Sequence, residues 1–177
     1  MKYKAGMILN FKWYDGWLGK LIAWKNRMMD KTNGYTHTAI IGEVTPEYCV
    51  VYEAAEKGFV KSNYEIQWLD QRYEEGKFEV GETIVAVKDV KNISEKYLGT
   101  PYSFVTIFLI GLYFIMGRRA LNFSDGVKTM ICSEAICRVL YDASNKKVDF
   151  VAEFGKPYDI IEPQDLSKSK QIEWRTN

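Results

Sequence analysis

The chain contains side chains that could perform nucleophilic catalysis together. It has a single histidine, His37, which excludes any mechanism that needs two imidazoles and any multi-histidine metal site. Its three cysteines are Cys49, Cys132 and Cys137. A thiol nucleophile needs a base, and His37 is the only imidazole that the chain offers. A cysteine–histidine pair is therefore the first chemistry to consider.

Cys132 is the cysteine whose surroundings favour reactivity. The apolar residues between Thr129 and Tyr141 recur at helical spacing, which predicts a helix with Cys132 in or near its first turn. The partial positive charge and open N–H groups of a helix start would stabilise a thiolate and hold an oxyanion. The alternative is a buried cysteine that acts as a small hydrophobe. For Cys49, in a predicted strand, and Cys137, in the middle of the helix, we expect structural roles.

His37 and Glu53 are predicted to lie on neighbouring strands. Residues 35–44 are rich in β-branched side chains, and residues 49–55 form a second strand-like run. If the two strands pair antiparallel, Glu53 could reach a ring nitrogen of His37 and fix its tautomer. The alternatives are a structural histidine and an exposed edge-strand carboxylate. Glu56 is the nearby competitor, but it falls in the predicted turn.

The remaining elements must position these three side chains. We expect one domain over residues 1–177, because the chain has no internal repeat and no low-complexity linker. The mixture of elements predicts an α+β fold. The other predicted strands span 7–11, 58–61 and 82–88, the other predicted helices span 15–28, 94–98 and 101–116, and the tail 159–166 is expected to be extended.

The composition narrows the classes of partner and the compartment. Of the 177 residues, 24 are Lys or Arg and 23 are Asp or Glu, so the net charge of +1 does not favour nucleic-acid binding. The three scattered cysteines and the absence of a recognisable signal peptide favour free thiols in a reducing, cytoplasmic compartment. One histidine and three scattered cysteines lack zinc-ligand spacing, so no metal or other cofactor is expected.

An apolar helical segment is predicted over residues 101–117. Its core, residues 104–116, is 13 residues without a charge. A membrane-spanning helix needs roughly 20 apolar residues. We therefore expect a helix that packs on the core or forms an exposed patch near the cleft. Contact with a membrane through residues 104–116 is the alternative.

Several short strings, taken in order, resemble a known family. They are AGMILNFK, THTAIIGE, VYEAAEKGFV, YLGTPYSF, ICSEAICRVL and IIEPQDL. Together they resemble the circularly permuted papain-like amidases, the YiiX/YebB-like branch of the NlpC superfamily, which is also related to the lecithin retinol acyltransferase group. The order of histidine, glutamate and cysteine is the permuted order. The chain departs from the pattern at Met7, where an aspartate is common.

The resemblance implies a permuted papain-like (NlpC-type) core, with an antiparallel sheet packed on the nucleophile helix. It implies Cys132 as the nucleophile, His37 as the general base and Glu53 as the residue that orients the histidine. The backbone N–H of Cys132 would hold the oxyanion. Tyr35 or Tyr102 would supply a polar side chain that binds the substrate.

The function that follows is a cysteine hydrolase that cleaves an amide bond through a thioester intermediate. The substrate would be a peptidoglycan-like peptide, another peptide or isopeptide, or a lipid amide. A lipid acyl hydrolase or acyltransferase uses the same intermediate and stays open as an alternative. A non-catalytic binding or membrane-associated module on the same fold is the alternative from a different class.

Overall fold

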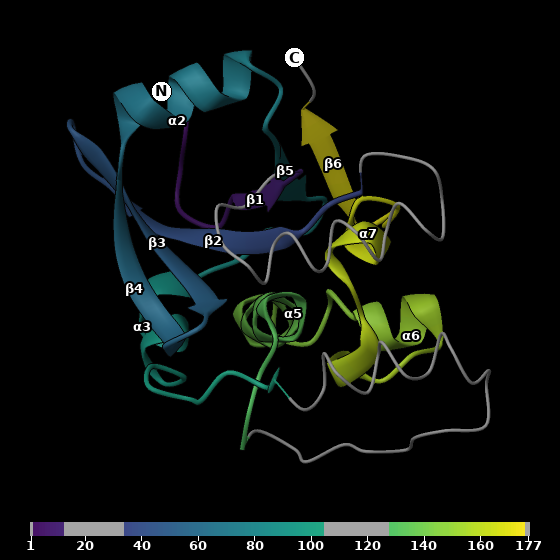
Figure 1. Cartoon of the computed structure of the whole chain (residues 1–177). Coiled ribbons are helices and arrows are strands. Elements are labelled where there is room, and N and C mark those ends of the chain that lie inside the picture. Colours follow the sequence, from purple (N-terminus) through teal and green to yellow (C-terminus); the bar gives the residue numbers. More distant parts are fainter. Residues whose placement is uncertain (1, 13–33, 105–127, 176–177) are drawn as a thin grey trace.

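The computed structural model of the chain describes residues 2–12, 34–104 and 128–175 (Figure 1). Within these residues, six strands form one antiparallel sheet in the order β4-β3-β2-β1-β5-β6. The strands are β1 (Ile8–Phe11), β2 (His37–Val44), β3 (Tyr48–Ala55), β4 (Gly58–Glu65), β5 (Phe78–Thr83) and β6 (Ile172–Arg175). The helices are α2 (Ile66–Glu74), α3 (Val90–Glu95), α5 (Cys132–Ala143), α6 (Phe150–Phe154), the 3-10 helix η1 (Tyr158–Ile160) and α7 (Pro163–Leu166).

Both faces of the sheet are covered, and a different helix covers each face. Figure 1 shows α5 on one side of the sheet and α2 on the other. Ile40 and Tyr52 pack in the cluster that includes Ile136 of α5. Their neighbours along the strands, Ala39 and Val51, instead pack in the cluster that includes Leu69 of α2. This alternation is what a strand buried on both faces requires.

The hairpin of β2 and β3 sets the register on which the site depends. The pairing aligns Ala39 with Glu53 and shifts by one residue between Ile41 and Glu43. At the shift, a Cβ on Gly42 would lie 2.3 Å from the ring of Tyr52, so glycine is required there. The shift leaves the end of the hairpin near Glu53 in regular pairing.

Several sequence predictions are confirmed. The predicted strands at 7–11, 35–44 and 49–55 correspond to β1, β2 and β3, and the predicted helix at 129–141 corresponds to α5. The α+β class is also confirmed, with a six-stranded antiparallel sheet and short helices in the described residues. The predicted helix at 15–28 and the part of the predicted helix at 101–117 beyond residue 104 lie outside the described residues. The predicted start of the second helix is wrong, because residues 101–103 are not helical and Tyr102 forms a β-bridge with Met130.

Two predicted strands have the wrong bounds. The short strand expected at 58–61 continues to Glu65, because every residue of β4 pairs with β3. The strand expected at 82–88 ends at Thr83 as part of β5. The pairing of β5 with β1 reaches only Gly81 and Ile8, and the pairing with β6 ends at Thr83. Within the described part of the chain, residues 84–88 therefore have no neighbouring strand to pair with.

The helical predictions outside α5 are less accurate. The helix expected at 94–98 is α3 (Val90–Glu95), which buries Val90 in the α5 cluster. The tail 159–166 is not extended, because it forms η1 and α7. A capping box of Glu162 and Asp165, with Pro163 in the first turn, starts α7. Helix α2 was not predicted, since Leu69 is its one buried residue and it lacks a clear apolar stripe.

None of the helices among residues 2–12, 34–104 and 128–175 has the length and apolar character needed to cross a membrane.

Candidate active site

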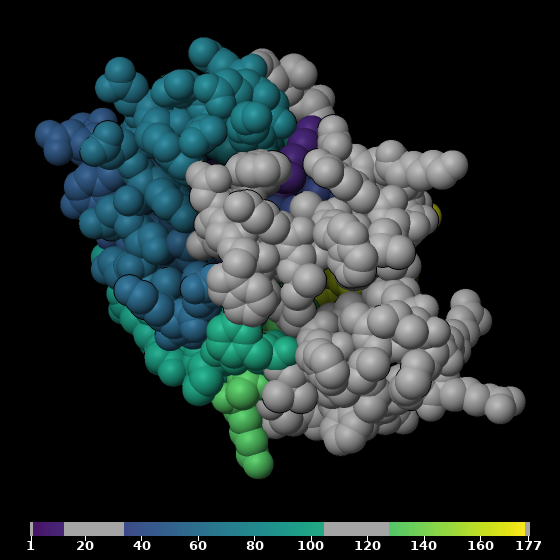
Figure 2. Space-filling model, viewed as in Figure 1, coloured from purple at the N-terminus to yellow at the C-terminus, as the bar shows by residue number. Residues whose placement is uncertain are grey.

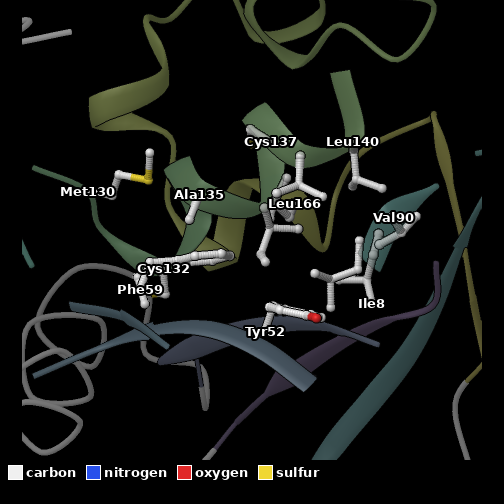
Figure 3. Close-up of a cluster of buried hydrophobic side chains, with 14 of the residues drawn as sticks. Ile8, Tyr52, Phe59, Val90, Met130, Cys132, Ala135, Cys137, Leu140 and Leu166 are labelled. Carbon is white, nitrogen blue, oxygen red and sulfur yellow. The ribbon is translucent and has the colours of Figure 1, made fainter. Parts of the chain in front are cut away.

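Cys132 is the first residue of α5. The preceding residue, Ile131, is extended and caps the helix without a side-chain hydrogen bond. The first-turn N–H groups of such a helix point outward without intrahelical partners. Cys132 is buried in the cluster between α5 and the sheet, and Figure 3 shows it beside Phe59 and Ala135. Its position at the start of a helix confirms the sequence prediction.

The segment that precedes α5 is held by backbone hydrogen bonds. Met130 pairs in parallel with Tyr102, through bonds of 2.9 Å to the Pro101 carbonyl and 3.0 Å from the Ser103 N–H. Within α5, the hydroxyl of Ser133 donates to the carbonyl of Ile161. The start of the helix is thus tied on both sides of Cys132.

His37 and Glu53 lie together on neighbouring strands. His37 begins β2, and Glu53 pairs with Ala39, two residues further along the strand. The two side chains are diagonal neighbours on one face of the sheet. Nε2 of His37 lies 2.7 Å from Oε2 of Glu53, and both residues are buried. Glu56, the competitor in the sequence, lies in the turn after β3.

Cys132 lies close enough to the His37 imidazole to act on its pKa. Burial alone would lower the pKa of His37, but hydrogen bonds with Cys132 and Glu53 raise it to about 9. Burial would raise the pKa of Glu53, but the hydrogen bond and positive charge of His37 hold it below its ordinary value. The structure therefore brings together the three residues that the sequence singled out.

Sequence reasoning missed the β4 side of this site. The Tyr64 hydroxyl donates to Oε1 of Glu53 at 2.9 Å, and the Ser62 hydroxyl also hydrogen-bonds with this carboxylate. Glu53 pairs with Val60, and side chains at every second residue of a strand share a face. A strand prediction that continued past residue 61 would have placed Ser62 and Tyr64 beside Glu53.

The two tyrosines predicted to bind substrate lie in different surroundings. Tyr102 is buried beside Met130, and its ring meets that of Phe104 edge-on at 5.1 Å. The hydroxyl of Tyr35 hydrogen-bonds with Glu79, and burial together with this bond raises its pKa. The structure thus places Tyr102 next to the segment that enters α5 and directs Tyr35 toward β5. Their roles in substrate binding stay predictions.

The other two cysteines are buried, and burial is the main influence on each thiol. Burial, with a smaller contribution from the charge of Asp70, raises the pKa of Cys49 to about 11. Burial, followed by the charge of Glu134, raises the pKa of Cys137 well above its ordinary value. Neither environment favours a thiolate at neutral pH.

A second buried carboxylate lies in the first turn of α5. Glu134 accepts hydrogen bonds from Arg138, with Nη2 2.8 Å and Nε 2.9 Å from Oε1. Burial is the main reason that the pKa of Glu134 rises to about 7; Arg138 opposes this rise and the charge of Asp159 adds to it. Glu134 lies two residues after Cys132 in the sequence.

The described residues contain no group of three His, Cys, Asp or Glu side chains arranged to hold a metal ion.

A comparison with solved structures gives a match of fold. No family model matches the chain, and no curated protein matches it. The crystal structure of the metalloprotein YiiX from Escherichia coli O157:H7 (DUF1105) is similar, with a TM-score of 0.61 and 16% sequence identity. The match covers 99% of this chain and 98% of that chain. The two chains thus share a fold, which supports the YiiX-like part of the resemblance drawn from the sequence.

Proposed function

We propose that this chain is a cysteine hydrolase of amide bonds, built on a permuted papain-like core. In this proposal Cys132 is the nucleophile, His37 the general base and Glu53 the residue that orients His37. One observation carries the proposal. The only imidazole of the chain lies 2.7 Å from Glu53, and its pKa is raised by Cys132, the cysteine that begins a twelve-residue helix.

The first chemical step is the attack of the Cys132 sulfur on the substrate carbonyl carbon. His37 holds the thiol proton as an imidazolium, since its pKa is about 9, and the carbonyl π electrons move to the oxygen. Glu53 stabilises the imidazolium that results, because its carboxylate is held ionised at Nε2. The backbone N–H groups at the start of α5 are the available donors for the oxyanion.

The second step releases the two products. The tetrahedral intermediate collapses, the carbon–nitrogen bond breaks, and His37 gives its proton to the leaving amine. A water molecule then attacks the thioester carbon, and its proton passes through His37 to the Cys132 sulfur. A pKa of His37 near 9 suits the proton donor of the amide step.

The similar YiiX structure is described as a metalloprotein, so a metal site needs a test here. A zinc site needs at least three protein ligands. In the described part of this chain no three suitable side chains gather, and Nε2 of His37 already bonds Glu53. These residues do not fit a metal ion, and no step is assigned to one.

The substrates that we propose are peptides, including peptidoglycan-like peptides and isopeptides, and lipid amides. All present an amide carbonyl to the same thiol. A lipid acyl hydrolase would share the thioester and differ in the bond that is cleaved, and an acyltransferase would differ in the acceptor of the acyl group. We propose that the enzyme acts in a reducing compartment, without a cofactor and without a nucleic-acid partner.

The test of this proposal compares the three thiols of one protein. We expect iodoacetamide at about pH 6 to label Cys132 first, because ordinary thiols are protonated at that pH. Peptide mapping by mass spectrometry would give the labelling rate at each cysteine. His37→Ala should slow the labelling of Cys132 and leave Cys49 and Cys137 unchanged. Equal labelling of all three, unaffected by His37→Ala, would remove the argument for catalysis.

A substrate panel then separates hydrolysis from binding. Peptide, isopeptide and acyl-amide substrates should be cleaved by the wild type and not by Cys132→Ala. The matched variants Cys49→Ser and Cys137→Ser should keep the activity. Acyl transfer to an added amine or alcohol would identify an acyltransferase. A reactive Cys132 with binding but no turnover on any substrate would favour the binding module.

A further inference from the structure

The Glu53 carboxylate is shared between two strands. Its Oε2 faces His37 at 2.7 Å, and its Oε1 accepts the Tyr64 hydroxyl at 2.9 Å. The Ser62 hydroxyl is a further hydrogen-bond partner of this carboxylate. Each oxygen therefore has its own donor, and the plane of the carboxylate is defined from both β2 and β4.

The ring of Tyr64 is itself held by aromatic neighbours. Trp68 of α2 stacks on it, with ring centroids 5.2 Å apart and planes 24° apart. Phe11 of β1 meets it edge-on at 6.5 Å, and the same Phe11 ring lies 5.8 Å from the His37 ring. Figure 2 shows the residues of α2 at the surface of the molecule. Tyr64 thus connects a surface helix to the buried pair.

We propose that Tyr64 is a positioning residue of the Cys132 site. Its hydroxyl fixes the Glu53 carboxylate against His37 and takes up part of the carboxylate's negative charge. This inference rests on the proposed function for its effect on catalysis, but the contact itself does not.

The sharing of charge has a consequence for His37. A hydrogen bond that stabilises the carboxylate leaves it a weaker acceptor for its other partner. The tyrosine hydroxyl therefore limits how strongly Glu53 holds a proton on the imidazole. A general acid that holds its proton too strongly releases it slowly to the leaving group. Tyr64 keeps the pKa of His37 closer to the pH at which the imidazole must both take and give a proton.

Few titratable groups compete with this effect among the described residues. Among the described residues, Cys132, from α5, and Glu53, from β3, act on His37. Those that act on Glu53 are His37 and Tyr64, together with the neutral Ser62 hydroxyl. Phe11, which packs from β1, carries no charge. A change in the pKa of His37 after substitution of Tyr64 can therefore be traced through Glu53.

The single histidine makes this pKa directly measurable. With 13C-labelled histidine, the protein gives one set of imidazole NMR signals, which come from His37, because the chain has no other histidine. Tyr64→Phe keeps the ring and removes only the hydroxyl. We expect it to raise the pKa of His37 by about half a unit. Ser62→Ala should shift the pKa in the same direction, and the double variant should shift it furthest.

Tyr73→Phe is the matched control. Tyr73 also lies on the α2 side, and its hydroxyl bonds the carbonyl of Arg175 rather than a carboxylate. Its loss should leave the pKa of His37 unchanged. An unchanged or lowered pKa in Tyr64→Phe would overturn the inference, as would an equal shift in the control.

A catalytic readout separates this inference from the proposed function. In Tyr64→Phe the alkaline limb of the pH dependence of kcat should move upward with the NMR pKa. An NMR shift without any hydrolysis by the wild type would remove the proposed function and leave the contact role of Tyr64. Hydrolysis without the NMR shift would retain the proposed function and remove Tyr64 from it.

Discussion

Two buried glutamates of this protein both have basic partners, yet their pKa values are shifted in opposite directions. Glu53 is 2% exposed and lies 2.7 Å from His37, while Glu134 is 1% exposed and lies 2.8 Å from Arg138. Burial raises the pKa of both. The net pKa of Glu53 is nonetheless lowered, whereas that of Glu134 rises to about 7. A cation at hydrogen-bonding distance therefore does not by itself decide the charge of a buried carboxylate.

The difference lies in what else surrounds each carboxylate. Glu53 accepts hydrogen bonds from His37, Ser62 and Tyr64, so both of its oxygens have donors. For Glu134, Arg138 and the backbone at Ile131 favour the charged form, but the negative charge of Asp159 opposes it. Hydrogen-bond donors on both oxygens of Glu53 compensate for the water lost on burial. For Glu134, the nearby carboxylate of Asp159 cancels part of the stabilisation that Arg138 provides.

The largest effect is expected from Glu53→Gln. The amide keeps the shape of the side chain but removes the charge that stabilises the imidazolium. The pKa of His37 should fall from about 9 by about two units, because an opposite charge in contact accounts for a shift of that size. Histidine NMR would measure the pKa. Hydrolysis at neutral pH should fall about a hundredfold.

The pH dependence of stability provides a check on the same pair. The raised pKa of His37 gives stability that is present below about 6.5 and is lost as the pH rises through about 9. The lowered pKa of Glu53 gives stability that is present above about 4.5 and is lost as the pH falls. A pKa of His37 that stays near 9 in Glu53→Gln would show that the charge of Glu53 does not set it.

Glu134→Gln should have a smaller effect, and of the opposite kind. The pKa of Glu134 is raised from 4.5 to about 7, so the folded state loses stability as the pH rises through 7. The glutamine cannot ionise and escapes this loss. Relative to the wild type, the variant should gain about 2 kcal/mol of unfolding free energy between pH 5 and pH 8.

Urea denaturation of both proteins at the two pH values would measure this gain. Glu134→Asp is the control, because it keeps an ionisable group in the first turn. A difference between glutamine variant and wild type that does not change with pH would mean that Glu134 is ionised throughout this range.

The comparison also shows which parts of the site could be predicted from the sequence. His37 and Glu53 lie on strands whose β-branched residues and alternation identify them, and their contact follows from hairpin pairing. Cys132 begins a helix whose apolar stripe is visible in the sequence. These residues could be placed because each depends on local periodicity and on one pairing between neighbouring strands.

The surroundings of the two glutamates could not be predicted in the same way. Tyr64 lies in the half of β4 whose outward residues are polar, so its strand character depends on pairing with β3. From the sequence, Glu134 and Arg138 would be expected to form an exposed ion pair, because residues three or four apart are the usual partners on a helix surface. Its burial depends on η1, which carries Asp159 and Tyr158, and that segment was expected to be extended. Long-range packing decides both environments.

The smallest effect is expected at the aromatic ring that supports the second pair. The guanidinium of Arg138 lies over the Tyr158 ring, with its carbon 5.0 Å from the ring centroid. Tyr158→Leu would remove this cation–π contact and the edge-on contact of Tyr158 with Tyr141 at 6.2 Å. We expect a loss of about 1 kcal/mol in the free energy of unfolding, measured by urea denaturation.

Tyr158→Phe keeps both ring contacts and should cost less than half as much. Because Arg138 opposes the rise in the pKa of Glu134, a less firmly held guanidinium should also move that pKa above 7 in Tyr158→Leu. The pH dependence of stability in this variant should therefore shift upward, while the pKa of His37 stays at its wild-type value. A shift of the His37 pKa in Tyr158→Leu would show that the two buried pairs are coupled through α5, and that the Glu53 and Glu134 environments are not independent.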